Sequence, residues 1–309
     1  MPQVKQGDPM PDPVPTHAPR LSAHFTVGSA RIAALSDGAP ARELGGFFAG
    51  IEASEWTRAL GIPSADTAVP FNFGSFLIRH SGRTILVDSG YGIPALSMGI
   101  PGGGGLLDCI DEVGIAREDI DAVFFTHLHP DHCGWNTTAA EDGSVALTFP
   151  NATLYVAQAE LDFWLSEQAP ADRAAVARQQ TLPYQVADRI HTFTGEFEVA
   201  PGITTVPTPG HTPGHTSLMV ASAGRHLLIT GDAAHHPVHF EHHTWIPGVD
   251  LDPAESTRSR GKLAALAADR DALVTGGHFA ILTLGKVRRD GDTYAWEYVE
   301  RPRDVREGR

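Results

Sequence analysis

The stretch Thr126-His127-Leu128-His129-Pro130-Asp131-His132 places three imidazoles and one carboxylate within six residues. It follows the apolar run 120–125, whose β-branched and aromatic residues predict a buried strand. Side chains two apart point to the same side at the end of a strand, so His127 and His129 can bind one cation together.

The turn after this strand carries two more candidate ligands. Pro130 breaks the strand, and Asp131 and His132 can then face a second cation. Imidazole and carboxylate are the ligands that zinc and similar cations prefer, so the stretch predicts a metal site. The alternative is a polar loop that is rich in histidine by chance. Cys133 follows directly and could also be a ligand, but a small buried filler is the preferred interpretation because the other residues already supply a full set.

Length and composition limit the class of protein. A chain of 309 residues suits one large domain or two small ones with a sizeable core. The formal net charge of −14 argues against a nucleic-acid partner, because phosphate-backbone binding is driven by Lys and Arg. Two cysteines imply no disulfide framework and are compatible with the reducing cytoplasm, where we expect the protein. Neither a membrane-spanning stretch nor a signal-peptide pattern is present.

The sequence predicts a short tail and one folded domain. Residues 1–20 carry six prolines and few apolar groups, which indicates a flexible extended tail. Residues 21–309 are expected to form the folded domain. A homodimer in which the tail lies on the partner subunit is compatible with this division.

Hydrophobic patterning predicts alternating strands and helices. We expect strands over 24–28, 30–36, 72–79, 84–87, 120–125, 152–157, 203–206, 217–221, 226–230 and 272–275, and a hairpin over 284–299. Helices are expected over 53–60, 106–113, 161–165, 171–180 and 252–268. Turns are predicted at Asp37-Gly38 and Ser81-Gly82. The glycine-rich segment 91–105 lacks the ending of a phosphate-binding loop and is expected to be a mobile flap or a surface loop.

Two strand segments resemble each other, 83–90 and 225–232, and each leads to an acid, Asp88 or Asp232. This likeness predicts two similar halves, each a sheet with helices, packed with the sheets inside and the helices outside.

Three further candidate ligands lie far apart in the sequence: His211, Asp232 and His278. Each follows an apolar strand and stands in a turn flanked by glycine or proline. Strand ends gathered on one edge of a sandwich would bring these residues to the first motif.

This pattern resembles the metallo-β-lactamase superfamily, on residues His127, His129, Asp131, His132, His211, Asp232 and His278. The resemblance covers most of residues 21–280 and implies an α/β (α+β) fold, the αβ/βα four-layer sandwich. It places His127, His129 and His211 on one divalent metal ion. It places Asp131, His132 and His278 on a second one, with Asp232 bridging the pair. Zn2+ is the favoured metal, and Mn2+, Co2+ and Fe2+ are alternatives.

The resemblance also assigns two neighbouring residues. In the family's Pro-Gly-His motif the first histidine binds metal and the second braces the turn, which favours His211 over His215 as the ligand. Asp88 resembles the acid that holds a ligand imidazole in one tautomer. The alternative for Asp88 is an aspartate that caps a turn.

The bridging Asp232, and the lack of a helical domain after His278, favour one branch of the family. That branch resembles quorum-quenching N-acyl-homoserine lactonases and methyl-parathion-hydrolase-like enzymes. The implied function is a dinuclear hydrolase that opens a lactone by attack of a metal-bridging hydroxide, with Asp131 carrying the proton to the leaving group. The alternatives are an organophosphate triester or another ester on the same site, and a non-catalytic metal carrier.

One departure concerns the substrate. The best-known lactonases carry a tyrosine where this chain has His235, so either His235 donates a similar hydrogen bond to a small-molecule ester or lactone, or the substrate differs. The alternative is that His235 and His236 are surface loop residues. Aromatic side chains could line the substrate pocket, with these candidates: Phe71, Phe73, Phe76, Phe163, Trp164 and Trp245.

Overall fold

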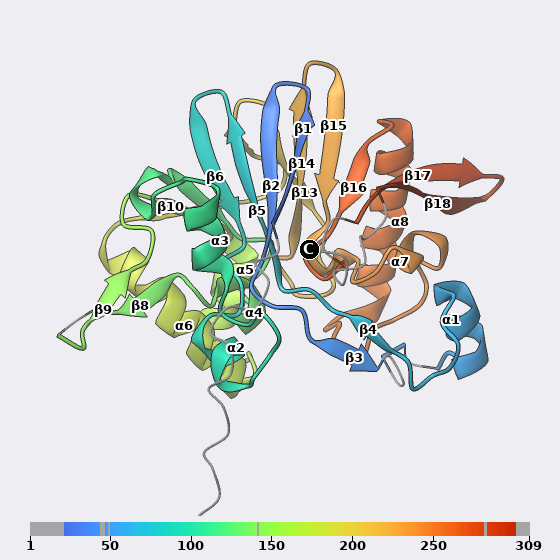
Figure 1. The fold of residues 1–309 in the computed structure, drawn as a ribbon, viewed down its shortest axis with the longest axis horizontal. Coiled ribbons are helices and arrows are strands. Elements are labelled where there is room, and N and C mark those ends of the chain that lie inside the picture. The colour runs from blue at the N-terminus through green and yellow to red at the C-terminus, as the bar shows by residue number, and fades with distance from the viewer. Residues whose placement is uncertain (1–21, 44–46, 49, 141, 281–282, 301–309) are drawn as a thin grey trace, which may run out of the picture.

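The computed structural model describes residues 22–43, 47–48, 50–140, 142–280 and 283–300. The predicted tail, 1–20, lies outside the described residues. Two seven-stranded sheets face each other, and helices cover their outer faces (Figure 1). This is the predicted α/β sandwich of four layers. Within the described residues, no helix is long and apolar enough to cross a membrane.

The first sheet is mixed, and the last four strands in its order run parallel to one another. Its order is β1 (Ser22–Val27), β2 (Ala30–Ser36), β5 (Gly74–His80), β6 (Arg83–Val87), β7 (Ala122–Phe124), β10 (Thr153–Ala157) and β11 (Ile190–Phe193). Strands β6, β7, β10 and β11 are parallel, so the loops after them leave from one edge.

The second sheet is also mixed, with β15 and β16 as its parallel pair and antiparallel pairing elsewhere. Its order is β12 (Glu198–Ala200), β13 (Ile203–Pro207), β14 (Thr216–Ser222), β15 (Arg225–Ile229), β16 (Leu273–Thr275), β17 (Leu284–Asp290) and β18 (Thr293–Glu300). Strands β6 and β15 both stand fourth in their sheets, and each pairs in parallel with the next strand in order. The predicted likeness of the two halves is therefore confirmed. Two small hairpins lie outside the sheets: β3 (Ala41–Glu43) with β4 (Ala68–Pro70), and β8 (Thr137–Ala139) with β9 (Val145–Leu147).

Helices close the sandwich on both sides. Helices α3 (Leu106–Glu112), α5 (Gln158–Leu165) and α6 (Ala171–Val186) cover the first sheet, and α7 (Val238–Glu241) and α8 (Pro253–Asp269) cover the second (Figure 1). The remaining helices are α1 (Ala53–Leu60), α2 (Ile93–Ser97), α4 (Pro130–Cys133), and the 3-10 turns Arg117–Asp119 and Gly231–Ala233.

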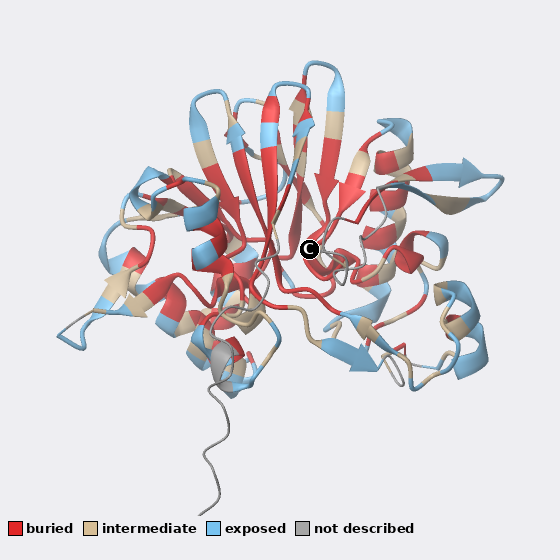
Figure 2. Cartoon of the chain, in the orientation of Figure 1, coloured by how far each residue is buried: buried red, intermediate tan, exposed pale blue. Residues whose placement is uncertain are grey.

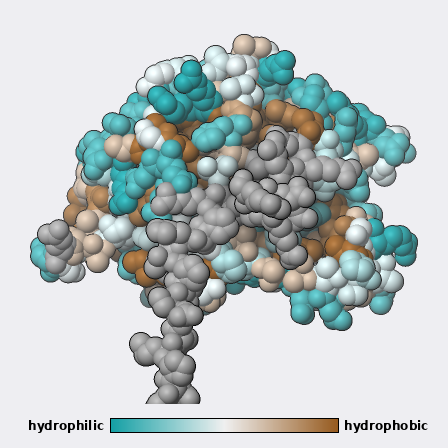
Figure 3. Space-filling model, viewed as in Figure 1, coloured by the Kyte–Doolittle hydropathy of each residue, from teal (hydrophilic) through white to brown (hydrophobic). Residues whose placement is uncertain are grey.

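Alternation along the strands explains why both faces of each sheet are buried (Figure 2). In β6, Ile85 and Val87 pack between the sheets, whereas Leu86 packs under the helices. In β15, Leu227 and Ile229 face the first sheet, and Leu228 packs against α8. On the face drawn in Figure 3, hydrophilic side chains cover much of the surface of the described residues, with smaller apolar areas between them.

Most predicted elements are confirmed, including the hairpin at Ser81-Gly82 and the helix start capped by Asp252. The predicted turn at Asp37-Gly38 is wrong, because the Asp37 N–H donates to the Phe73 carbonyl and the Phe73 N–H donates to the Gly38 carbonyl, so the chain continues to pair beside residue 73. Strands β1 and β2 are joined at Gly28-Ser29, where Gly28 takes a φ of +59° and a Cβ would clash with the backbone of Ser222.

Two further expectations need correction. Segment 91–105 is not only loop, because it contains α2 and its Gly103 packs against the backbone of Ala95. Helix α6 continues to Val186 rather than ending at Gln180, and Pro183 lies inside it.

Candidate metal centre

The seven predicted ligands come together at one end of the two sheets, each just beyond the end of a strand or on the turn that follows. His127 and His129 follow β7, and Asp131 and His132 lie on α4. His211 follows β13, Asp232 lies on the 3-10 turn after β15, and His278 follows β16. Within the described residues, three groups could hold a metal ion, with their ligand atoms within 4.8 Å of one another: His127, His129, His211 and Asp232; Asp131, His132 and His278; and Asp232, His235 and His278.

The first group is buried and its imidazoles face one another. Nδ1 of His129 lies 2.9 Å from Nε2 of His127 and 2.9 Å from Nε2 of His211. Asp232 Oδ2 lies 3.3 Å from Nε2 of His211. Burial lowers the pKa of both His127 and His129 well below the usual value, so each presents a neutral ring with one lone pair.

The second group lies directly against Asp232 of the first. Nε2 of His278 lies 3.4 Å from Nε2 of His132 and 3.5 Å from Asp131 Oδ2. Asp232 Oδ1 lies 3.3 Å from His132, and its Oδ2 lies 3.0 Å from His278. Burial raises the pKa of Asp232, but the surrounding imidazoles, His278 foremost, outweigh burial and hold the pKa well below its usual range. One carboxylate thus reaches both groups.

Hydrogen bonds behind the rings decide where the lone pairs point. His278 Nδ1 donates to the backbone carbonyl of Asn72 at 2.8 Å, so its Nε2 carries the lone pair. The Thr126 hydroxyl donates to Asp88 and therefore accepts from Nδ1 of His127 at 3.0 Å. Lone pairs then point at the centre.

Two carboxylates also contact ring nitrogens of the candidate ligands. Asp88 lies 2.8 Å from Nδ1 of His132, which confirms that it holds a ligand-candidate imidazole rather than only capping a turn. Asp250 lies 3.0 Å from Nδ1 of His211 and also pairs with the buried Arg260.

The directions of the ring lone pairs and the kinds of donor atom show whether these residues can hold two metal ions. Neutral imidazoles that aim lone pairs at one point repel one another unless a cation lies between them, and outer hydrogen bonds of this kind fix metal-binding histidines. Asp232 Oδ1 is also buried without a hydrogen-bond partner within the described residues. The donor set of imidazoles and carboxylates therefore fits two divalent cations of the borderline class.

His215 and Cys133 take the structural positions that were predicted for them. His215 Nδ1 contacts Thr208, and its Nε2 accepts from the backbone N–H of Asp232 at 2.9 Å, so His215 braces the turn. Cys133 is buried, and its thiol contacts the carbonyl of Leu128 at 3.8 Å.

Sequence reasoning missed a buried carboxylate that joins the two ligand loops. Glu160 accepts four hydrogen bonds, from the backbone of Leu128 and Gly214 and from the side chains of Trp164 and Thr212. Leu128 lies between two ligand candidates, and Thr212 follows a third. Glu160 stands one residue before the predicted helix 161–165 and four residues before Trp164, and that spacing was the available signal. Asp250 has no comparable signal in the sequence.

A cleft of ≈ 380 Å³ opens beside the cluster. Aromatic and charged side chains line it together with the candidate ligands: Arg42, Phe47, Phe71, Phe73, Tyr91, Pro94, His129, Pro130, Asp131, Asp172, Arg173, Val176, His211, Asp232, His235, Val249 and His278. Its volume suits a small molecule.

Two of the six predicted pocket aromatics, Phe71 and Phe73, line this cleft. The other four do not. Trp164 is fully buried, and its indole N–H is bound to Glu160. Phe163 packs against the core, Trp245 against Phe48, and Phe76 lines a different cavity.

His235 lies in the cleft wall and is buried, so the interpretation as a surface loop residue is wrong for it. Its Nε2 lies 3.3 Å from Asp232 Oδ2, and its backbone N–H donates to His239. Its Nδ1 is buried with no hydrogen-bond partner within the described residues. His236 is half-buried.

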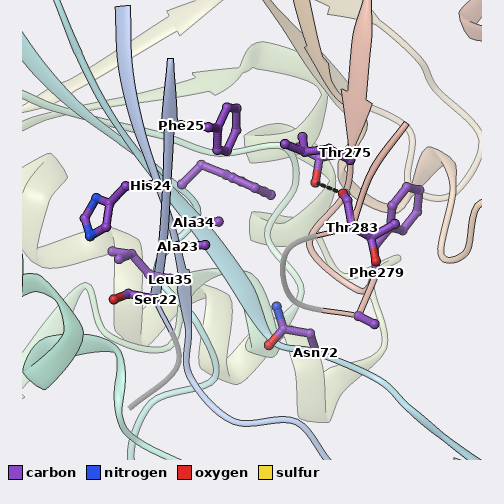
Figure 4. Close-up of a pocket in the computed structure, with 14 residues that line it drawn as sticks. Ser22, Ala23, His24, Phe25, Ala34, Leu35, Asn72, Thr275, Phe279 and Thr283 are labelled. Atoms are coloured by element: carbon purple, nitrogen blue, oxygen red, sulfur yellow. Dashed lines mark hydrogen bonds between the residues drawn. The ribbon is translucent and has the colours of Figure 1, made fainter. Parts of the chain in front are cut away.

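A second cavity of ≈ 340 Å³ lies between β1, β2 and the chain after β16 (Figure 4). Thr275 and Thr283 are joined there by a hydrogen bond of 3.0 Å. Asn72 lines this cavity, while its carbonyl holds His278. None of the three candidate metal groups lies in this cavity, so the cleft beside them is the candidate active site.

Comparisons with known proteins agree with this geometry. The model of the metallo-beta-lactamase superfamily matches residues 75–278. The N-acyl homoserine lactonase AttM of Rhizobium radiobacter is 29% identical over 232 residues, which are 69% of this chain and 83% of that protein. An N-acyl homoserine lactonase of a Bacillus species is 29% identical over 158 residues, 51% of this chain and 56% of the relative.

Solved structures share the fold. AidC, a dizinc quorum-quenching lactonase bound to a product, aligns with a TM-score of 0.77 at 24% identity and covers 91% of this chain and 98% of its own. The hydrolase AbOPH aligns with a TM-score of 0.76 at 27% identity, over 89% of this chain and 96% of its own.

Proposed function

Because the chain belongs to the metallo-beta-lactamase superfamily of metal-dependent hydrolases, we propose that it is a dinuclear lactonase that opens the ring of a small-molecule lactone. One observation carries this proposal. The two oxygens of buried Asp232 lie between two groups of converging imidazoles at the base of the cleft.

In this proposal His127, His129 and His211 hold one cation, and Asp131, His132 and His278 hold the other. Asp232 would lie within reach of both. Zinc is the proposed metal, because the donor set combines imidazole with carboxylate. When bound, such a pair activates a water molecule as the nucleophile and stabilises negative charge on the substrate oxygens.

The chain's own residues orient the substrate and move the proton. Asp131 is the more exposed of the two carboxylates, with 24% of its side chain accessible, and it lines the cleft. It is therefore positioned to carry a proton to the leaving alkoxide. His235 stands beside Asp232 in the cleft wall, where its ring can donate a hydrogen bond to the carbonyl of the substrate.

The cleft offers an apolar wall for the rest of the substrate. Phe47 contacts the His235 ring edge-on at 5.5 Å, and Phe71 stacks on His278 at 4.0 Å. An acyl chain can pack on these rings while the ester group faces the cluster. The curated relatives named above are N-acyl homoserine lactonases, which supports a lactone as the substrate class.

The test is a substrate panel on zinc-loaded protein, with an acyl-homoserine lactone, a simple lactone, an aryl ester and a phosphotriester. We expect lactone opening to have the highest kcat/KM, and Asp232→Ala to abolish it. Asp108→Ala, which removes an exposed acid on α3, is the matched control and should retain activity. Full activity of Asp232→Ala contradicts the proposal. Preference for the phosphotriester would assign the alternative substrate class to the same site.

A further inference from the structure

The candidate active-site cleft contains two arginines in a chain whose net charge is −14. Arg42 and Arg173 both line the cleft, and within the described residues neither forms an ion pair with a carboxylate. Unpaired guanidinium groups in a cleft wall are strong binding groups for planar anions such as carboxylates.

Arg173 lies on the side of the first group. Its Nη1 is 3.2 Å from Nε2 of His129, which is the one acceptor that Arg173 reaches within the described residues. Nδ1 of the same ring faces His127 and His211. If Nδ1 gives its lone pair to a cation, as the proposed function requires, the neutral ring keeps its proton on Nε2 and cannot accept from Arg173. Loading the centre therefore leaves the guanidinium free to bind an acceptor on the substrate.

Arg42 lies on the side of the second group. Its guanidinium carbon is 4.9 Å from the centre of the Phe71 ring, a cation–π contact. Phe71 in turn stacks on His278. This contact holds a second positive charge over the apolar wall without neutralising it.

Tyr91 lines the same cleft and lies within the electrostatic range of both arginines. Burial and the Asp131 carboxylate raise the pKa of the Tyr91 phenol, whereas Arg42 and Arg173 both oppose that rise. Both guanidinium groups are therefore close enough to influence the same cleft side chain.

We propose that Arg173, assisted by Arg42, selects substrates that carry a carboxylate a few bonds from the ester group that is hydrolysed. This proposal rests on the proposed function. One imidazole ring separates Arg173 from the cluster, so the two substrate groups must lie a short chain apart. A half-ester or a lactone with a carboxylate side chain has this arrangement.

The test uses two esters that differ in one group, mono-4-nitrophenyl glutarate and methyl 4-nitrophenyl glutarate. The first carries a carboxylate where the second carries a neutral methyl ester. For the zinc-loaded wild type, we expect kcat/KM to favour the charged ester by about tenfold or more, because charge-assisted hydrogen bonds are stronger than neutral ones. The preference should shrink in about 1 M salt, where charges are screened within about 3 Å.

Three variants test whether Arg173 itself causes the preference for the charged ester. Arg173→Met should bring the ratio of the two kcat/KM values close to one. Arg58→Met, which removes an exposed arginine on α1 outside the cleft, is the matched control and should keep the wild-type ratio. Asp172→Asn removes a negative charge from the cleft and should increase the ratio. An equal preference in the wild type and in Arg173→Met overturns the proposal.

A binding measurement separates this proposal from the proposed function. Calorimetry on the zinc-loaded protein should show glutarate binding about tenfold more tightly than monomethyl glutarate, and Arg173→Met should remove the difference. Hydrolysis of the neutral ester without any preference for the charged one overturns this proposal and leaves the proposed function standing. If neither ester is hydrolysed, the hydrolase assignment fails for aryl esters, and the calorimetric comparison still decides the role of Arg173.

Discussion

Replacing Glu160 with glutamine should loosen both loops that carry the first group of candidate ligands. Oε1 of Glu160 accepts from the Leu128 N–H at 2.9 Å and from the Trp164 indole at 2.6 Å. Oε2 accepts from the Thr212 hydroxyl at 2.6 Å and from the Gly214 N–H at 3.0 Å. All four donors are satisfied by one buried side chain.

The expected loss of unfolding free energy follows from the four hydrogen-bond donors around Glu160. A glutamine amide keeps one oxygen, which must face Leu128 and Trp164 because these two groups can only donate. Its NH2 then faces Thr212, whose hydroxyl can turn and accept, and Gly214, whose N–H cannot. One buried donor is left without an acceptor, which costs about 1–3 kcal/mol. The weaker bonds to a neutral oxygen add to this cost, and the smaller desolvation of an amide offsets part of it. We expect a net loss of about 2 kcal/mol.

The assay is denaturant unfolding of metal-free protein, together with zinc affinity measured against a chromophoric chelator. Because the four hydrogen bonds of Glu160 join the loops of His127, His129 and His211, we expect Glu160→Gln to weaken zinc binding about 10–100-fold. Glu167→Gln, at an exposed position, is the control and should stay within about 0.5 kcal/mol of wild type. Thr212→Val removes a single donor and should lose about 1 kcal/mol, which keeps the test valid if Glu160→Gln does not fold. Equal stability and equal zinc affinity for Glu160→Gln and Glu167→Gln would show that Glu160 does not hold the two ligand loops together.

Three other outcomes are expected. Asp88→Ala removes the carboxylate 2.8 Å from His132 Nδ1, so zinc affinity in the chelator assay should fall about 10–100-fold, and an unchanged affinity would contradict the role of Asp88. Burial lowers the pKa of His215 to about 3 in the folded protein, against 6.5 in the unfolded chain. Between these two pH values the His215 ring therefore carries a proton in the unfolded state but not in the folded state. Unfolding free energy should therefore fall by about 2 kcal/mol through this residue between pH 6.5 and about pH 4.5, and His215→Gln should show a correspondingly shallower pH dependence in denaturant titrations. His235→Ala should lower kcat/KM while zinc content stays at two per chain; loss of one zinc would instead identify His235 as a ligand.

The candidate ligands could be predicted from sequence because their signals are local. The first four lie within one short stretch, and His211, Asp232 and His278 each stand in a turn directly after a strand. Parallel neighbours such as β6 with β7, and β15 with β16, then bring these turns to one edge without further information.

The supporting residues could not be predicted because their partners are set by tertiary packing. Arg173 contacts His129 across 44 positions of the sequence, and nothing near either residue encodes that contact. Asp37 was expected in a turn, but it is buried, and its carboxylate accepts from the indole of Trp135 and from the backbone of three residues that follow β6. Short aspartate–glycine pairs favour turns, yet here the distant donors determine the position of the carboxylate.

The most direct test of the dinuclear site is an anomalous difference map from crystals of the zinc-loaded protein, recorded at the zinc edge. We expect two peaks about 3.5–4 Å apart, one on each side of the Asp232 carboxylate. A single peak, or peaks away from Asp232, would contradict the proposed dinuclear site.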